Sequence, residues 1–256
     1  MVDERERLHA YFVEADSIQR LLRSSKPTDS RLRLLLKNVV PPKFRGTVRM
    51  LLTDLARPAQ SQRLKAMSEQ AGPLLVHLGS GGELKPGWVN IDLVGDPVEV
   101  AWNLARGVPF SDNSVDAIFH EHLFEHLTLQ QGAHLMDECF RVLKPGGILR
   151  VGVPDAGELL DSYLGDGSYL ESLHPNRPSR LIGVQELFYW HRHVAMYDDE
   201  TLALQFRAAG FPDPERRKFG DSDLDQAPDS ESRRAETLYM EAAKPLDVPA
   251  PRHRVS

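Results

Sequence analysis

The stretch Leu74-Leu75-Val76-His77-Leu78-Gly79-Ser80-Gly81-Gly82 decides the fold class of this chain. A short apolar run that ends in glycines is typical of a buried strand that leads into a tight turn. Soon after it, residues 88–92 (Trp-Val-Asn-Ile-Asp) predict a second short strand, which ends in an acidic residue. Two such strands, close together in the chain, indicate the beginning of an α/β sheet.

Further strands and helices alternate after this point. The apolar patterns predict strands at residues 98–102, 115–119 and 148–153, with a helix from Thr128 to Leu143 between the last two. They also predict a helix from Asp198 to Ala209, followed by an antiparallel pair of strands at 215–219 and 237–242. Alternation at this pitch is typical of a parallel sheet with helical crossovers. The sequence therefore predicts a doubly wound, Rossmann-like α/β fold.

Four ordered motifs resemble those of class I S-adenosylmethionine-dependent methyltransferases, in particular the methyltransferase type 11 group. They are residues 76–82 (Val-His-Leu-Gly-Ser-Gly-Gly), 87–92 (Gly-Trp-Val-Asn-Ile-Asp), 108–119 (Val-Pro-Phe-Ser-Asp-Asn-Ser-Val-Asp-Ala-Ile-Phe) and 141–150 (Arg-Val-Leu-Lys-Pro-Gly-Gly-Ile-Leu-Arg). Each piece alone is common, but their order is specific. The resemblance implies a seven-stranded sheet with an antiparallel last strand, and S-adenosyl-L-methionine as the cofactor.

The resemblance also implies which residues form the cofactor site. The turn Gly79-Ser80-Gly81 would lie against the cofactor, since glycine lets the backbone approach a ligand closely, and Asp92 would hold the ribose hydroxyls. Asn103 and Leu104 stand where the family has an acid that reads the adenine amine, and the Asn103 carbonyl is expected to accept in its place. His120, at the end of the fourth strand, stands where the methionine portion passes.

Histidines gather after the fourth strand, in the run Phe119-His120-Glu121-His122-Leu123-Phe124-Glu125-His126-Leu127. If a helical turn begins near its third residue, His122, Glu125 and His126 are spaced i, i+3 and i+4 and share one face. Imidazole and carboxylate groups arranged in this way can bind a divalent metal, and the downstream His193 is a candidate fourth ligand. The run resembles the E-x-x-E-H motif of ubiquinone-pathway and small-RNA O-methyltransferases, which implies Mg²⁺ or Mn²⁺. A histidine in place of the first glutamate favours Mn²⁺.

A metal-free interpretation uses the same part of the chain. The Glu-His-Leu sequence can simply cap and pack a helix, and His122, His193 or His191 then acts as a general base, because histidine has a pKa of about 6.5. In both interpretations the chemistry is removal of a proton from a hydroxyl that attacks an activated methyl group. The sequence leaves the two interpretations open.

Charge and composition narrow the class of protein. A net charge of −6 and a pI near 5.9 argue against a general nucleic-acid binder. Between Ile18 and Gln70, however, twelve lysines and arginines face three acidic residues. Helices predicted at 8–22, 31–40 and 46–56 indicate a helical cap, with peripheral contact to an anionic lipid surface as the alternative. The single cysteine, Cys139, excludes an internal disulfide, and the lack of an apolar span or leader favours a cytoplasmic protein.

The predicted domains are a helical cap at 1–70, a methyltransferase domain at 71–243 with an acceptor-binding insert at 155–197, and a disordered tail at 244–256. Aromatic residues of the insert are candidates for an acceptor pocket or are ordinary core residues (Tyr163, Tyr169, Phe188, Tyr189, Trp190, Tyr197). The layout after residue 153 resembles bacterial polysaccharide and cell-envelope methyltransferases, which implies O-methylation of a sugar hydroxyl. The alternatives are a lipid or quinone acceptor, and a non-catalytic cofactor-binding module.

Overall fold

The computed structural model describes residues 4–24, 39–41, 44–69, 72–94, 97–173, 175–189 and 193–247. The helix predicted at 31–40 falls almost entirely outside these ranges, as does most of the predicted tail. Within the described ranges, no helix is long and apolar enough to cross a bilayer.

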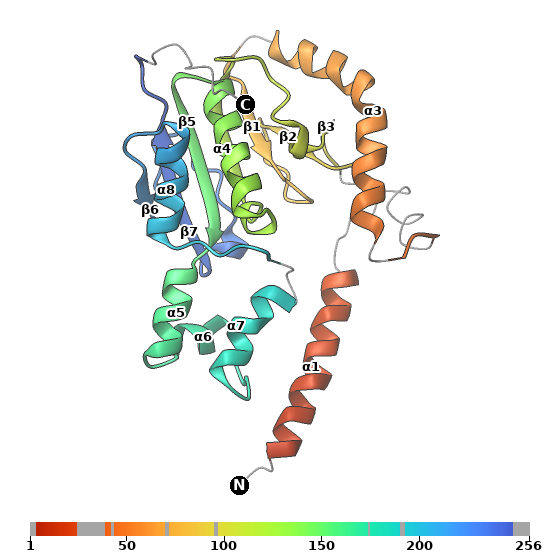
Figure 1. Ribbon diagram of the computed structural model, residues 1–256, viewed down its shortest axis with the longest axis vertical. Coiled ribbons are helices and arrows are strands. Elements are labelled where there is room, and N and C mark those ends of the chain that lie inside the picture. The colour runs from red at the N-terminus through yellow and green to blue at the C-terminus, as the bar shows by residue number, and fades with distance from the viewer. Residues whose placement is uncertain are drawn as a thin grey trace.

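Seven strands form one sheet in the order β3-β2-β1-β4-β5-β7-β6 (Figure 1). Strands β1 to β5 run parallel, whereas β7 is antiparallel to both β5 and β6. The bounds are β1 Leu75–Leu78, β2 Val89–Asp92, β3 Val100–Ala101, β4 Val115–Glu121, β5 Leu143–Pro154, β6 Glu215–Arg217 and β7 Thr237–Ala243. The doubly wound fold and the antiparallel C-terminal pair predicted from the sequence are confirmed.

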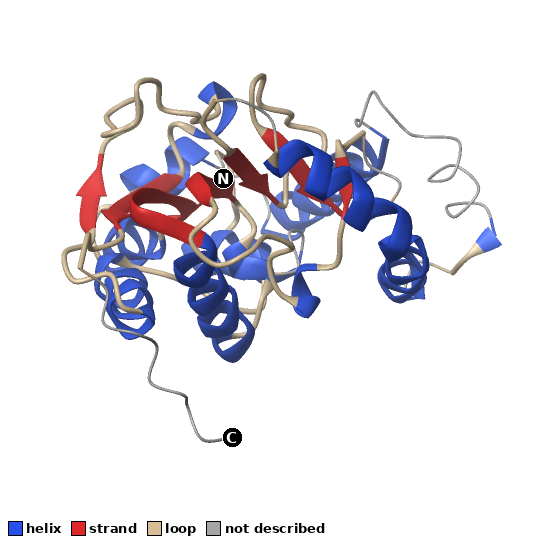
Figure 2. Ribbon diagram, turned by 90° about the horizontal axis from the view of Figure 1, so that it is seen from above, coloured by secondary structure: helices blue, strands red, loops and turns tan. Residues whose placement is uncertain are grey.

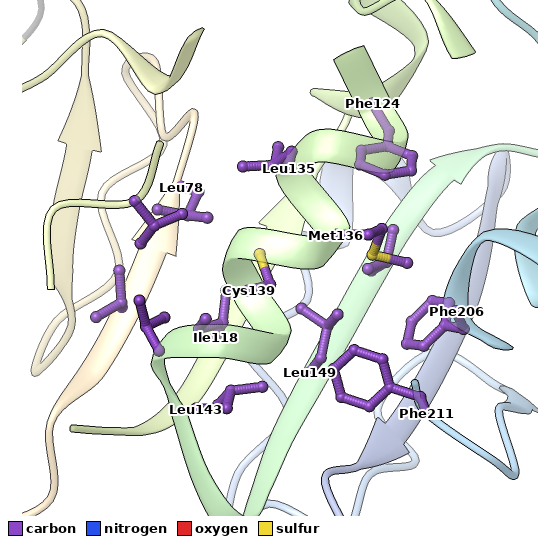
Figure 3. Packing of buried hydrophobic residues seen from close by; sticks show 14 of the residues in the cluster. Leu78, Ile118, Phe124, Leu135, Met136, Cys139, Leu143, Leu149, Phe206 and Phe211 are labelled. Atoms are coloured by element: carbon purple, nitrogen blue, oxygen red, sulfur yellow. The ribbon is translucent and has the colours of Figure 1, made fainter. Parts of the chain in front are cut away.

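One face of this sheet is apolar and packs beneath two helices, α4 (Leu129–Val142) and α8 (Asp199–Ala209). Helix α4 begins where predicted because Thr128 and Gln131 cap it reciprocally, each side chain accepting from the other's backbone N–H. Helix α8 ends at Gly210, which adopts a left-handed conformation. Figure 3 shows how the strands and both helices interdigitate in the core (Leu78, Ile118, Leu135, Met136, Cys139, Leu149, Phe206, Phe211).

The opposite face of the same strands is polar, and Figure 2 shows loops over it. Arg150 is fully buried there and donates to both carboxylate oxygens of Asp229 at 2.7 Å and to Glu241 at 3.0 Å. The same guanidinium donates to the backbone carbonyls of Lys218 and Asp221. Arg150 therefore fastens the β6–β7 loop onto this face of the sheet.

The cap contains two long helices in the described residues, α1 (Glu4–Ser24) and α3 (Arg45–Ser68). Helix α3 is longer than the predicted helix at 46–56, because it continues through Pro58. A proline within a helix removes one hydrogen bond and bends it, and α3 is bent in Figure 1. Leu64 beyond the proline is buried against the core, so packing offsets the lost bond.

The insert forms three helices, α5 (Ala156–Leu164), α6 (Ser168–Leu173) and α7 (Arg180–Tyr189). They lie beyond the carboxyl ends of the parallel strands, with α1 alongside α7 (Figure 1). Tyr11 of α1 donates to Glu186 of α7 at 2.9 Å, so the cap and the insert touch.

The ordered domain extends past residue 243, where we expected the tail to begin. Lys244 is buried, and its ammonium donates to the Asn113 side chain and to the carbonyls of Phe140 and Leu143 at 2.6–2.8 Å. Three acceptors on one buried cation fix this residue in the folded domain.

Removing the buried guanidinium tests how far the polar face depends on it. We expect Arg150→Ala to lower the free energy of unfolding by about 3–5 kcal/mol, because it leaves Asp229 and Glu241 buried without their cation. Arg234→Ala, which breaks an exposed pair with Glu231, should lower it by less than about 1 kcal/mol. Urea unfolding monitored by circular dichroism measures both changes. Equal losses of unfolding free energy in the two variants would contradict a stabilising role of the Arg150 contacts with Asp229 and Glu241.

Candidate functional site

The turn after β1 is built for close approach of a ligand. Gly79 and Gly81 have φ values of +64° and +54°, a region that favours glycine. A Cβ on Gly79 would lie 2.8 Å from the Leu123 side chain, so the turn also lacks space for one. The backbone N–H of Gly81 donates to the Asp92 carboxylate at 2.8 Å. The structure thus brings together the glycine turn and the acid that the sequence predicted for the cofactor.

Ser80, between the two glycines, has a side chain whose hydroxyl is buried and makes no hydrogen bond in the structure. A buried hydroxyl without a partner is unfavourable and calls for a polar group at that place. The turn is therefore suited to a ligand with hydrogen-bonding atoms, which is what S-adenosyl-L-methionine would offer.

Asn103 and Leu104 lie at the end of β3, next to β2. The Asn103 side chain caps a short 3-10 helix, η2 (Leu104–Arg106), and its Oδ1 atom accepts from the backbone N–H of Ala105 at 3.1 Å. Its Nδ2 atom faces the carboxylate of Asp54 on α3 at 3.4 Å. The carbonyl that we expected to face the cofactor is thus engaged in a cap, and an acid from the helical cap lies beside it.

Sequence reasoning missed this contribution of α3. Arg49 donates to the carbonyls of Leu93 and Val94 and lies 3.8 Å from Asp92, while Thr53 accepts from the backbone of Val94. These contacts place α3 across the carboxyl ends of β2 and β3. The available signal was the four-residue spacing of the polar residues Arg49 and Thr53.

His120 lies in the core, away from the surface of the site. Its side chain is on the apolar face of β4, is fully buried, and stacks on Phe124 with a centroid separation of 5.0 Å. Burial lowers its pKa from 6.5 to about 3, so the ring stays neutral. Neither ring nitrogen has a hydrogen-bond partner in the structure. His120 therefore has no exposed surface through which its ring could contact the methionine portion of a cofactor.

The histidine cluster forms, although not by the predicted helical turn. Strand β4 continues to Glu121, His122 adopts φ +51°, and only Phe124–His126 (η3) form a single 3-10 turn. The i, i+3, i+4 helical geometry that we expected is thus wrong, because β4 keeps its register with β5 up to Gly152. His122 instead contacts Glu125 through Nδ1 at 3.6 Å, and its Nε2 lies 2.9 Å from the Thr237 hydroxyl.

The structure brings His193 to the same carboxylate. Its Nε2 atom lies 3.8 Å from Glu125 Oε1, and the centroid of its ring lies 4.9 Å from that of the His126 ring. One ligand atom from each of Glu125, His126 and His193 lies within 4.8 Å of the others, which is close enough to share one ion. His122 contacts Glu125 but is not part of this trio, and His191 lies outside the described residues.

Glu125 has the most unusual environment in the cluster. Its carboxylate is buried, neither oxygen makes a hydrogen bond in the structure, and burial raises its pKa to about 8. A buried carboxylate needs a proton, a protonated histidine or a metal ion to balance its charge. The site can therefore take up either a proton or a cation.

Among the residues that the structure describes, the aromatic side chains of the insert do not gather in one pocket. Tyr197 is fully buried in the core against Phe124, Phe188 is exposed, and Trp190 lies outside the described residues. The insert also holds a cavity of about 310 Å³ between α6 and α7, whose lining combines charged side chains with apolar surface (Asp166, Leu170, Glu171, Arg177, Arg180).

Residues 89–151 match the family model described as a methyltransferase domain. A protein of Mycolicibacterium smegmatis, described as a probable S-adenosylmethionine-dependent methyltransferase, is 45% identical over 53 residues, which cover 21% of this chain and 20% of that protein. The match thus spans about a fifth of the length of this relative.

Two solved structures are among the matches of this chain. A SAM-dependent methyltransferase from Archaeoglobus fulgidus has a TM-score of 0.43 and 14% identity, covering 84% of this chain and 100% of that one. An O-methyltransferase family protein from Burkholderia thailandensis has a TM-score of 0.44 and 14% identity, covering 94% of this chain and 70% of that one. The strand order described above, rather than these values, establishes the fold.

The buried carboxyl of Glu125 makes stability depend on pH. Its pKa rises from 4.5 to about 8 on folding, so between these values the folded state keeps a proton that the unfolded state has lost. The free energy of unfolding therefore falls as the pH rises from about 5 to about 8. Glu125→Gln should lack this component and gain roughly 1–3 kcal/mol relative to wild type over that range. Urea unfolding with EDTA present measures it, and a pH-independent difference would contradict the assignment.

Proposed function

We propose that this chain is a methyltransferase. The premise is that residues 89–151 are part of a class I methyltransferase domain, and the sequence matches support S-adenosyl-L-methionine as its cofactor. The proposed reaction is O-methylation, with a sugar or oligosaccharide hydroxyl as acceptor. The observation that carries it is the position of the histidine cluster beside the glycine turn. The Leu123 side chain, three residues before His126, fills the space that a side chain on Gly79 would need, so the loop that carries the cluster packs against the glycine turn.

The chemistry follows from this arrangement. S-adenosyl-L-methionine supplies a methyl group already activated by a sulfonium, so the protein has to align and deprotonate the nucleophile. The acceptor oxygen forms the new C–O bond as the C–S bond breaks, and the sulfur keeps that electron pair. His193 takes the hydroxyl proton, with Glu125 at 3.8 Å positioned to stabilise the imidazolium. His122, on the other side of Glu125, is the second candidate base.

A divalent ion is the alternative partner of the same residues. Glu125, His126 and His193 offer one carboxylate and two imidazoles, a nitrogen-rich set that favours Mn²⁺ over Mg²⁺. An ion held there would lower the pKa of an acceptor hydroxyl bound to it. It would also balance the buried charge of Glu125.

A lipid or quinone acceptor at a membrane surface is the second candidate, favoured by the outer face of α3. Phe44, Leu51 and Leu55 are 51%, 59% and 77% exposed and point away from the sheet-facing Arg49 and Thr53. The surrounding segment carries the twelve basic residues noted above. Exposed apolar side chains among basic ones fit an anionic lipid surface.

Cofactor binding and methyl transfer test the enzyme. We expect purified protein to bind S-adenosyl-L-homocysteine in isothermal titration, and Asp92→Ala to weaken that binding at least roughly tenfold. His193→Ala should lower turnover by roughly 10²–10⁴-fold at unchanged cofactor affinity, because it removes a general base or ligand. His134→Ala on the exposed face of α4 is the matched control and should change neither quantity.

Transfer of a labelled methyl group to sugars, polyprenols and quinones distinguishes the possible acceptors. Assays with EDTA or with added Mn²⁺ distinguish the metal-assisted from the metal-free mechanism. Loss of turnover in EDTA that Mn²⁺ restores assigns the metal role, and unchanged turnover assigns the metal-free base. Binding of the cofactor without transfer to any acceptor would support the non-catalytic module. Lack of any cofactor binding would contradict the proposed function as a whole.

Vesicle sedimentation tests the membrane alternative. We expect the full chain to pellet with phosphatidylglycerol vesicles, to stay in solution with phosphatidylcholine vesicles, and to be released by about 0.5 M salt because surface charges are then screened. The double variant Leu51→Ser, Leu55→Ser should lose most of this binding. Leu160→Ser, Leu164→Ser changes two exposed leucines of α5 instead and should keep it. Equal pelleting of both double variants would argue against this surface.

A further inference from the structure

In its first half, helix α3 turns several polar side chains toward the sheet and leaves two leucines exposed to solvent. A helix that packs on a domain through the hydrophobic effect turns its apolar residues inward. In the first half of α3, Leu51 and Leu55 are exposed, whereas Arg49, Thr53 and Asp54 face the ends of β2 and β3. A row of polar side chains aimed at the carboxyl edge of the sheet indicates that this half of α3 lines a ligand site.

The strand order gives the direction in which a bound nucleoside lies. Asp92 at the end of β2 is suited to the ribose hydroxyls, and the histidine cluster follows β4 on the other side of β1. The sulfonium has to face the cluster for methyl transfer to occur. Because the base is attached to the opposite side of the ribose, it extends away from β4, toward the end of β3.

The groups at the end of β3 are suited to an adenine base. The Oδ1 atom of Asn103 already accepts from the backbone of Ala105, so its amide is oriented by the η2 cap. The carboxylate of Asp54 lies 3.4 Å from Asn103 Nδ2, is 25% exposed, and is held by Arg106 at 3.1 Å. Asp54 thus places a partly exposed carboxylate beside Asn103 at the end of β3.

We propose that Asp54 accepts a hydrogen bond from the exocyclic amine of adenine and so selects an adenine nucleoside over its deaminated counterpart. Asp54 lies 49 residues before Asn103 in the chain, in the helical cap, so the cap is a part of the cofactor site. Arg106 positions the carboxylate, and Asn103 shares its other oxygen. The inference rests on the proposed function, because it concerns the nucleoside that the function requires.

Two ligands that differ only at this amine test the proposal. S-adenosyl-L-homocysteine carries the amine, and S-inosyl-L-homocysteine carries a carbonyl oxygen in its place. We expect wild type to prefer the adenosyl compound by roughly tenfold or more in isothermal titration, because a hydrogen bond to a charged acceptor is lost and two oxygens face each other. In Asp54→Asn, an isosteric change that supplies a donor, the ratio of the two affinities should fall to within about threefold.

The controls separate recognition from structure. Arg63→Gln removes an exposed cation from the far half of α3, leaves the pair of Asp54 and Arg106 intact, and should retain the wild-type ratio. Each ratio is measured on one preparation, so an inactive fraction does not change it, and Asp54→Ser provides a second variant if the amide folds poorly. An unchanged ratio in Asp54→Asn with tight adenosyl binding would overturn the inference and leave the function standing. Failure of wild type to bind either compound would instead remove the function and, with it, the inference.

Discussion

The pairing of β1 with both β2 and β4 is the constraint on which the site depends. Because all three strands are parallel, their carboxyl ends meet at one edge, and the loop after β1 lies between those after β2 and β4. The turn at Gly79 has no space for a side chain because Leu123, from the loop after β4, occupies it. The hydrogen bond from Gly81 to Asp92 fixes the same turn to β2. A ligand on this turn therefore touches both halves of the sheet.

The sheet has two chemically different faces, and each serves the site in its own way. The apolar face under α4 and α8 supplies the hydrophobic core, and it keeps the buried His120 neutral. The polar face is held by Arg150 and its two carboxylate partners, so hydrogen-bonded loops can replace helices there. The same β6–β7 connection reaches the functional edge, where Thr237 at the start of β7 contacts His122.

The buried Glu125 is the strongest sign of function in the structure. A carboxylate with raised pKa and no hydrogen bond to its oxygens destabilises a fold, and such groups gather at functional sites. Three histidines from two segments surround it, and His122 keeps a positive φ that a non-glycine residue seldom adopts. A buried carboxylate beside histidines can take part in proton transfer or bind a metal ion, so the same residues support both interpretations.

The sequence by itself determined the order of strands and helices and the glycine turn after β1. Alternation of apolar residues marks strands, capping residues such as Thr128 and Gly210 mark helix ends, and parallel strands must bring Gly79 and Asp92 to one edge. These are local signals, or follow directly from topology. Helix α3 was longer than predicted, since burial of Leu64 outweighed the proline, and the helical turn at Glu121 was overridden by the pairing of β4 with β5.

Only the tertiary structure decided which distant side chains meet. The sequence made His193 a candidate, but its contact with Glu125 depends on the path of the chain between them, and Asp54 beside Asn103 depends on how α3 docks. The burial of Lys244 and the clamp around Arg150 likewise join residues far apart in the chain. The periodicity of a sequence indicates on which face of a helix or strand a residue lies. Which distant residue it contacts depends on how the elements pack, and no single stretch of sequence carries that information.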